Sequence, residues 1–183
     1  MREISLHVLD LANNALEAGA THLNVTVDVQ HGSDTVSVSI TDNGCGMDDE
    51  SALRAQDPFV TSRTTRKVGL GIPLFKAGCL GCGGTFRLES EPGWGTSVMG
   101  SWKLSHIDRP PLGDMAATAL LLILDPRIDL EFRASIDEKM FALRTADLRE
   151  ELGETPLHDP EVVGWIASYI RESLEALFGG EAL

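Results

Sequence analysis

Apolar and polar positions alternate with a period of two over much of the first hundred residues. Such alternation predicts strands that bury one face and expose the other. Turn-forming residues separate the strands within each pair, at residues 31–34 and 91–93. The expected strands cover residues 22–30, 35–41, 85–90 and 96–104.

Helical spacing replaces this alternation in the segments around the strands. Gly19 is suited to a left-handed helix cap, and Pro73 is tolerated because it falls in a first helical turn. Residues 57–69 are polar and irregular. The expected helices cover residues 3–19, 48–55 and about 70–81.

A short stiff connector containing two prolines predicts a boundary that divides the chain into residues 1–104 and 105–183. Asp114, Thr145 and Asp159 are expected to cap helices in the second part. We expect this part to pack onto the first or to pair two subunits. Its expected elements are a helix at 114–124, a hairpin at 128–136 and 139–143, and helices at 145–152 and 159–178.

Composition narrows the possible functions. The 183 residues suffice for one good hydrophobic core with a small added unit. The net charge of -13 argues against a general nucleic-acid binder, because phosphate contacts need clustered Lys and Arg. The longest apolar run is too short to cross a bilayer, and no signal-peptide pattern precedes it. We therefore expect a cytoplasmic protein that engages neither nucleic acid nor membrane.

The three cysteines fit a reducing compartment, because their number is odd and no export signal is evident. Cys79 and Cys82 form a Cys-x-x-Cys pair, but no second ligand pair with zinc spacing follows. The preferred interpretation is two small apolar residues at the end of a packed helix.

Four blocks of residues carry the candidate chemistry, and their order is more specific than any one of them. They are an Asn-bearing helix at 10–20, Asp42-Asn43-Gly44-Cys45-Gly46-Met47 after a strand, a basic Thr-rich loop at 58–67 leading into Gly69-Leu70-Gly71, and Gly93-Trp94-Gly95-Thr96. In this order they resemble the gyrase, chaperone, histidine-kinase and mismatch-repair superfamily of ATP-binding domains, also called the Bergerat fold, over residues 1 to about 104. The resemblance implies an α+β fold. Its core is a two-layer α/β sandwich with a mixed, mostly antiparallel sheet, helices on one face, and a small C-terminal α+β extension.

The resemblance implies a magnesium ligand and a catalytic residue on the first helix. Residues four apart share one helix face, so Asp10 and Asn14 point the same way. Asn14 matches the family residue that gives a side-chain oxygen to Mg²⁺, with Asn13 as the alternative if the register is shifted. Asp10 stands where ATP-hydrolysing members carry Glu to activate water, and it is one methylene shorter.

The resemblance also implies which residues contact the base of ATP. Asp42 matches the carboxylate that accepts a hydrogen bond from the exocyclic amine of adenine. Gly44 and Gly46 let the backbone approach the ring, and Met47 closes the same block. Thr96 matches the threonine that helps to hold Asp42 and the adenine.

The remaining candidates are assigned to the phosphates of the nucleotide and to the lid over them. Arg63 and Lys67 are expected to bind phosphate, with Thr61 and Thr64 as hydroxyl donors and Phe59 as an anchor or contact. Gly69, Leu70 and Gly71 introduce a helix whose free N–H groups can hold phosphate oxygens.

Two hypotheses of different classes follow for the function. In the first, the protein is a stand-alone kinase that transfers the γ-phosphoryl of Mg-ATP to a His or Ser of a partner protein. In the second, it is a nucleotide-gated binding module of the anti-sigma type. Slow ATP hydrolysis of the mismatch-repair type is a weaker third. Residues 14–20 resemble the mismatch-repair branch, whereas 69–74 and 89–96 resemble the histidine-kinase branch.

Overall fold

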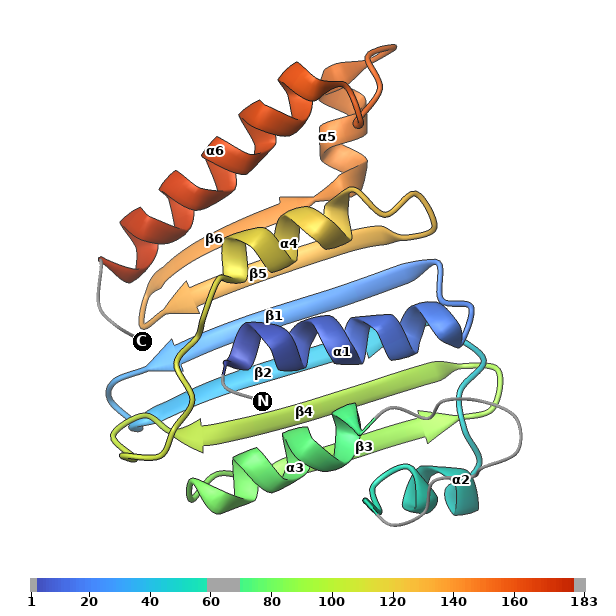
Figure 1. The fold of residues 1–183 in the computed structure, drawn as a ribbon, viewed down its shortest axis with the longest axis vertical. Coiled ribbons are helices and arrows are strands. Elements are labelled where there is room, and N and C mark those ends of the chain that lie inside the picture. The colour runs from blue at the N-terminus through green and yellow to red at the C-terminus, as the bar shows by residue number, and fades with distance from the viewer. Residues whose placement is uncertain (1–2, 59–69, 180–183) are drawn as a thin grey trace.

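The computed structural model describes residues 3–58 and 70–179, and this part of the chain has an α+β fold (Figure 1). The strands are β1 (His22–Gln30), β2 (Thr35–Asp42), β3 (Phe86–Glu91), β4 (Gly95–Lys103), β5 (Asp129–Ile136) and β6 (Lys139–Arg144). The helices are α1 (Ile4–Glu17), α2 (Asp49–Arg54), α3 (Gly71–Gly81), α4 (Met115–Ile123), α5 (Thr145–Leu152) and α6 (Pro160–Phe178).

All six of these strands form one mixed sheet in the order β3-β4-β2-β1-β5-β6. The β1–β5 pair is parallel and the other pairs are antiparallel, as the expected fold requires. The C-terminal hairpin therefore extends the sheet beyond β1, and the segments on either side of residue 104 share one hydrophobic core. The division of the chain near residue 104 stays a prediction.

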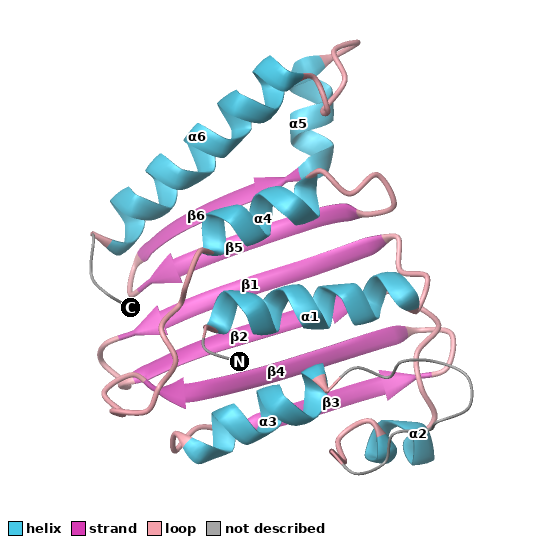
Figure 2. Cartoon of the chain, viewed as in Figure 1, coloured by secondary structure: helices cyan, strands magenta, loops and turns pink. Residues whose placement is uncertain are grey.

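Helices α1, α3 and α4 lie over the same face of the sheet (Figure 2). The apolar members of each alternating strand point to that face, where Trp102, Phe75 and Phe132 are among the largest fully buried side chains. The opposite face carries small polar residues such as Thr26, Ser37 and Ser101, which are partly exposed. One face packed and one face polar is what period-two alternation predicts for an antiparallel sheet.

Aspartate caps confirm three of the six expected helix starts. Asp48, Asp114 and Asp159 each accept a hydrogen bond from a backbone N–H of the following helix, at 2.7, 2.8 and 2.9 Å. Each bond satisfies one of the N–H groups that a helix start leaves free. Helix α1 ends two residues earlier than expected, and Gly19 follows it in the left-handed region with φ 76°.

Thr145 does not cap α5, so that expectation is wrong. Arg144 occupies the cap position and makes no side-chain cap. The buried Thr145 hydroxyl instead contacts the backbone of Leu130 in β5, lying 3.1 Å from its N and 3.4 Å from its carbonyl oxygen. A contact between distant segments has thus replaced the local cap, and it joins α5 to the sheet.

His7 is a buried titratable group in the core between α1 and α3. Its ring packs against Phe75 and Trp102, with centroids 5.7 and 6.5 Å apart. In the described part of the chain its Nδ1 atom has no hydrogen-bond partner. Burial lowers the pKa of His7 from 6.5 to about 4, because the protonated ring loses its hydration.

Acidification is therefore expected to destabilise the protein through His7. Above pH 6.5 the ring is neutral in both states, and between pH 6.5 and 4 only the unfolded chain takes up the proton. The free energy of unfolding should fall by up to about 3 kcal/mol across this window. Urea unfolding at neutral pH and at about pH 5 measures the part of this loss that occurs above pH 5. His7→Leu should reduce that loss, and the exposed His158→Leu should not. If the free energy of unfolding of His7→Leu falls with pH as much as that of the wild-type protein, His7 is not the cause of the loss.

Candidate functional site

Three neighbouring strands end in polar residues on the face of the sheet that the helices cover. Asp42 follows Val36, Val38 and Ile40 at period two, so its side chain points to the core side of β2. Thr96 of β4 lies opposite Asp42, and Ser90 of β3 lies opposite Thr96. Strand register therefore gathers a carboxylate and two hydroxyls at one edge of the core.

A cavity of about 360 Å³ lies over this edge. It extends between α1, the ends of β2 and β4, the loop after β2, α2, and the first turn of α3. Five predicted site residues meet in it, together with apolar side chains that would face a flat ring. The lining residues are Leu11, Asn14, Ala15, Glu17, Ala18, Ile40, Asp42, Cys45, Gly46, Met47, Ser51, Ala55, Ile72, Thr96 and Val98.

The Asp42 carboxylate is half-buried and directed by its own loop. Its Oδ1 atom accepts a 2.7 Å hydrogen bond from the Gly44 N–H. Burial raises the pKa of Asp42, and the backbone N–H groups of Gly44 and Thr96 oppose that rise by hydrogen bonding to the charged form. A half-buried carboxylate with spare acceptor capacity suits a ligand group that donates hydrogen bonds.

Backbone hydrogen bonds hold the loop after β2 on both sides. The Cys45 N–H donates to the Ala18 carbonyl at the end of α1, at 2.9 Å. The Cys45 carbonyl accepts from the Gly93 N–H in the β3–β4 turn, at 2.8 Å. The Asn43 side chain accepts from the backbone N–H groups of Thr21 and His22. The loop is therefore fixed before any ligand arrives, which favours binding.

Two glycines of the site are required by close backbone contacts. Gly46 has φ 65°, and a Cβ atom there would lie 1.9 Å from the Glu91 carbonyl oxygen. Gly95 has φ 102°, and a Cβ atom there would lie 2.0 Å from the Asp42 carbonyl oxygen. Gly44 does not line the cavity, but a Cβ there would lie 2.9 Å from both Ala18 Cβ and Asp42 Oδ1. The site glycines thus allow the β3–β4 turn, the β2 loop and α1 to pack together.

Helices α1 and α3 bring Asp10, Asn14 and Gly71 together. A Cβ atom at Gly71 would lie 3.3 Å from Asp10 Cβ and 3.5 Å from Asn14 Nδ2. Asn14 lines the cavity and Asn13 is exposed, so the register of α1 turns Asn14 toward the site. Asp10 is not a lining residue; it lies at the α3 end of the site, where burial raises its pKa. The raised pKa makes Asp10 a better proton acceptor than an ordinary aspartate.

The donor set at Asn14 fits a magnesium ion that is held mainly by phosphate. Among the described residues, no three His, Cys, Asp or Glu side chains cluster as metal ligands would. The Asn14 side chain lies beside the first turn of α3, where phosphate groups are expected, and its amide oxygen is a hard ligand. Magnesium keeps waters and bridges phosphate oxygens, so one protein oxygen is compatible with such a site.

Several predicted residues cannot be placed, because residues 59–69 lie outside the described part of the chain. They are Phe59, Thr61, Arg63, Thr64, Lys67 and Gly69. Of the following pair, Leu70 precedes α3 and is half exposed, whereas Gly71 is its buried first residue.

Sequence reasoning missed Ser90, whose hydroxyl contacts Met47, Gly95 and Thr96. Only the expected pairing of the strands around residues 91–93 could have placed it opposite Thr96. It also missed Glu17 and Ser51, which line the cavity from α1 and α2.

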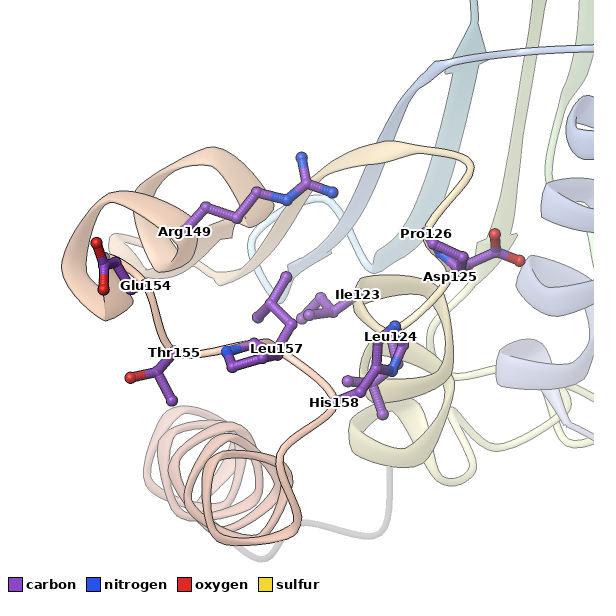
Figure 3. Close-up of a pocket in the computed structure, with 11 residues that line it drawn as sticks. Ile123, Leu124, Asp125, Pro126, Arg149, Glu154, Thr155, Leu157 and His158 are labelled. Carbon is purple, nitrogen blue, oxygen red and sulfur yellow. The ribbon is translucent and has the colours of Figure 1, made fainter.

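A second cavity, of about 300 Å³, lies between α4, α5 and the loop before α6 (Figure 3). Two of its charged side chains are already paired, Arg149 with Asp129 and Asp125 with Arg127. None of the predicted site residues lines it. Of these two cavities, only the one beside Asp42 is lined by predicted site residues that the structure describes.

The chain is similar to several known proteins, mainly over its first hundred or so residues. Residues 2–106 match the family described as "Histidine kinase-, DNA gyrase B-, and HSP90-like ATPase". The sensor protein kinase FleS of Pseudomonas aeruginosa is 38% identical over 89 residues, which are 49% of this chain and 22% of that protein. The DNA mismatch repair protein MutL of Chlorobium phaeobacteroides is 45% identical over 56 residues, 31% of this chain and 8% of that protein.

A third relative, the non-motile and phage-resistance protein of Caulobacter vibrioides, is 30% identical over 125 residues. The match covers 63% of this chain and 15% of that protein, so the chain spans a minor part of each relative's length. The structure of the N-terminal domain of a DNA repair protein superposes with a TM-score of 0.50 over 79% of this chain and 53% of that chain. At 14% identity this similarity shows the fold alone.

None of the described helices is long and apolar enough to span a membrane.

Proposed function

The chain belongs to the family of histidine kinase-, DNA gyrase B- and HSP90-like ATPases, and from that membership we propose that it binds Mg-ATP in the cavity beside Asp42. We propose further that it transfers the γ-phosphoryl group to a histidine or serine of a partner protein in a regulatory pathway. Similarity to both a sensor kinase and MutL supports an ATP-binding domain that is kinase-like or hydrolytic. That a side chain of a partner protein accepts the phosphoryl group is part of what we propose.

The register of β2 and β4 is the observation that carries the proposal. It sets Asp42 and Thr96 opposite each other at one end of a mainly apolar cavity. An adenine ring placed there would bury its faces against Ile40, Ile72 and Val98, while its amino group donates to the carboxylate. The cavity of about 360 Å³ falls within the range of small-molecule sites.

The triphosphate would then extend toward Asn14 and the N-terminus of α3. Free N–H groups at a helix start favour negative charge. Magnesium, when bound, would neutralise charge on the phosphates, and the Asn14 side-chain oxygen would hold it there. In the transfer, the bond between the γ-phosphorus and the β–γ bridging oxygen breaks. A P–N or P–O bond forms to the partner side chain, the proton of that side chain passes to solvent, and ADP leaves.

A nucleotide-gated binding module is the second candidate, and one observation favours it. Asp10 stands where hydrolysing members carry Glu, is one methylene shorter, and does not line the cavity. A shorter side chain outside the cavity lining is poorly placed to reach a water beside the γ-phosphate, which is compatible with ATP binding that is followed by little turnover. In this case bound ATP would change the affinity for a partner without labelling it.

Incubation with γ-labelled Mg-ATP, alone and with proteins encoded by neighbouring genes, distinguishes these functions. Label on a partner that is lost in Asp42→Asn supports the kinase. Release of free phosphate that is lost in Asp10→Asn supports an ATPase instead. Nucleotide-dependent capture of an unlabelled partner supports the binding module. Failure of the folded protein to bind ATP would overturn the proposal as a whole.

A further inference from the structure

The Ser90 hydroxyl lies where three segments of the site meet. Its Oγ atom is 2.8 Å from the Met47 N atom in the loop after β2. It is 3.0 Å from the Gly95 carbonyl oxygen at the start of β4 and 2.9 Å from Thr96 Oγ1. Ser90 is partly buried, and its β3 position lies directly opposite Thr96.

The chemistry of these partners determines the direction of each hydrogen bond. A serine hydroxyl has one proton to donate and two lone pairs that can accept. The Met47 N–H can only donate, so it occupies one lone pair. The Gly95 carbonyl can only accept, so it takes the Ser90 proton. The remaining lone pair then accepts the proton of the Thr96 hydroxyl, and this assignment satisfies all three contacts at once.

This direction determines what Thr96 presents to a ligand. Thr96 lines the cavity, but its only proton is used within the protein. The Thr96 hydroxyl can therefore meet a ligand only as an acceptor, and the nearby carboxylate of Asp42 also accepts when it is ionised. A ligand edge with hydrogen-bond donors can bond to both Asp42 and Thr96. An edge with acceptors alone can bond to neither and would leave buried acceptors facing each other.

We propose that Ser90 is a positioning residue that sets base specificity through Thr96. By accepting the hydrogen bond of the Thr96 hydroxyl, Ser90 makes the wall of the site select a purine that carries its amino group at C6. Without Ser90 the Thr96 hydroxyl can rotate and donate to a ring nitrogen or keto oxygen. This inference rests on the proposed binding of ATP, and it names the side chain that enforces the choice of adenine.

Dissociation constants for ATP and purine riboside triphosphate test the proposal. The analogue lacks the amino group and presents only acceptors at that edge. The wild-type protein should prefer ATP by about 100-fold, and Ser90→Ala should narrow this preference by about 10-fold. Thr96→Val should narrow it as well, and the double variant should narrow it no further than Thr96→Val alone, because Ser90 acts through Thr96. Ser97→Ala is the matched control, because that hydroxyl pairs with Thr41 on the opposite face of the sheet.

If a folded Ser90→Ala protein binds ATP and purine riboside triphosphate more weakly by the same factor, the ratio of the two dissociation constants is unchanged. That result would overturn the proposal and leave Ser90 a purely structural role. If Ser90→Ala does not fold, the comparison of Thr96→Ser with Thr96→Val replaces it. The serine should keep the preference for ATP and the valine should lose it, and equal ratios would overturn the proposal. If the wild-type protein binds neither nucleotide, the proposed function fails with the inference. If it binds ATP and only the ratios disagree, the inference alone fails.

Discussion

Asp42→Asn is expected to weaken ATP binding by about 100-fold or more while leaving the protein folded. The Asn side-chain oxygen can still accept from the Gly44 N–H, so the loop keeps its 2.7 Å contact. The other position of the side chain changes from a charged oxygen to an NH₂ group. That group would face the amino group of adenine, donor against donor, and the lost hydrogen bond is the expected source of the effect.

Isothermal titration with Mg-ATP measures this change, and thermal unfolding confirms that the variant is folded. The matched control is Asp48→Asn. Asp48 is a nearby exposed aspartate that caps α2 through the Ser51 N–H, and an Asn oxygen can keep that cap. The two variants lose the same charge, but only the first alters the cavity. Equal ATP affinity in Asp42→Asn and Asp48→Asn would contradict the role of Asp42.

Gly46→Ala is expected to destabilise the protein by about 3 kcal/mol or more and to abolish nucleotide binding. A Cβ atom at Gly46 would lie 1.9 Å from the Glu91 carbonyl oxygen, which is far inside contact distance. Because the obstacle is backbone, it cannot rotate away, and the β2 loop would have to leave the β3–β4 turn. That movement would also break the bond between the Met47 N–H and Ser90.

Gly93→Ala separates this clash from the cost of the backbone conformation. Gly93 also has a positive φ, 82°, but a Cβ atom there would meet nothing within 4 Å. The control should therefore cost only about 1 kcal/mol, the penalty for a left-handed alanine. Urea unfolding of both variants gives the comparison. If Gly46→Ala and Gly93→Ala lower the free energy of unfolding equally, the packing of the β2 loop against the β3–β4 turn is not what requires glycine at position 46.

The four N-terminal strands could be predicted because their alternation is local, and so could the side of the sheet that Asp42 and Thr96 occupy. The pairing of β5 with β1 could not. Residues 129–136 alternate like any half-buried strand, and nothing in that pattern names a parallel partner about a hundred residues away. The C-terminal part was therefore assigned only a general packing role, although it extends the same sheet.

Within the site, helix periodicity predicted that Asp10 and Asn14 share one face of the helix, and Asn14 does line the cavity. It did not show that Asp10 lies beyond the lining, because a shared helix face carries no information about distance. Thr145 and Ser90 were misjudged or overlooked for a related reason. From the sequence alone, a hydroxyl near the end of a helix or strand is assigned a local role such as a helix cap. Its contacts with distant segments depend on how the strands are paired.

Titration of ¹⁵N-labelled protein with Mg-ATP, followed by backbone amide shifts, tests the central claim most directly, because it reports binding and its location together. We expect one saturable site, with the largest shifts at Asn14, Gly44, Gly46, Met47 and Thr96. Residues around the second cavity, such as Thr155 and Leu157, should be unaffected. Shifts centred on that second cavity, or no shifts at saturating Mg-ATP, would contradict an ATP site beside Asp42.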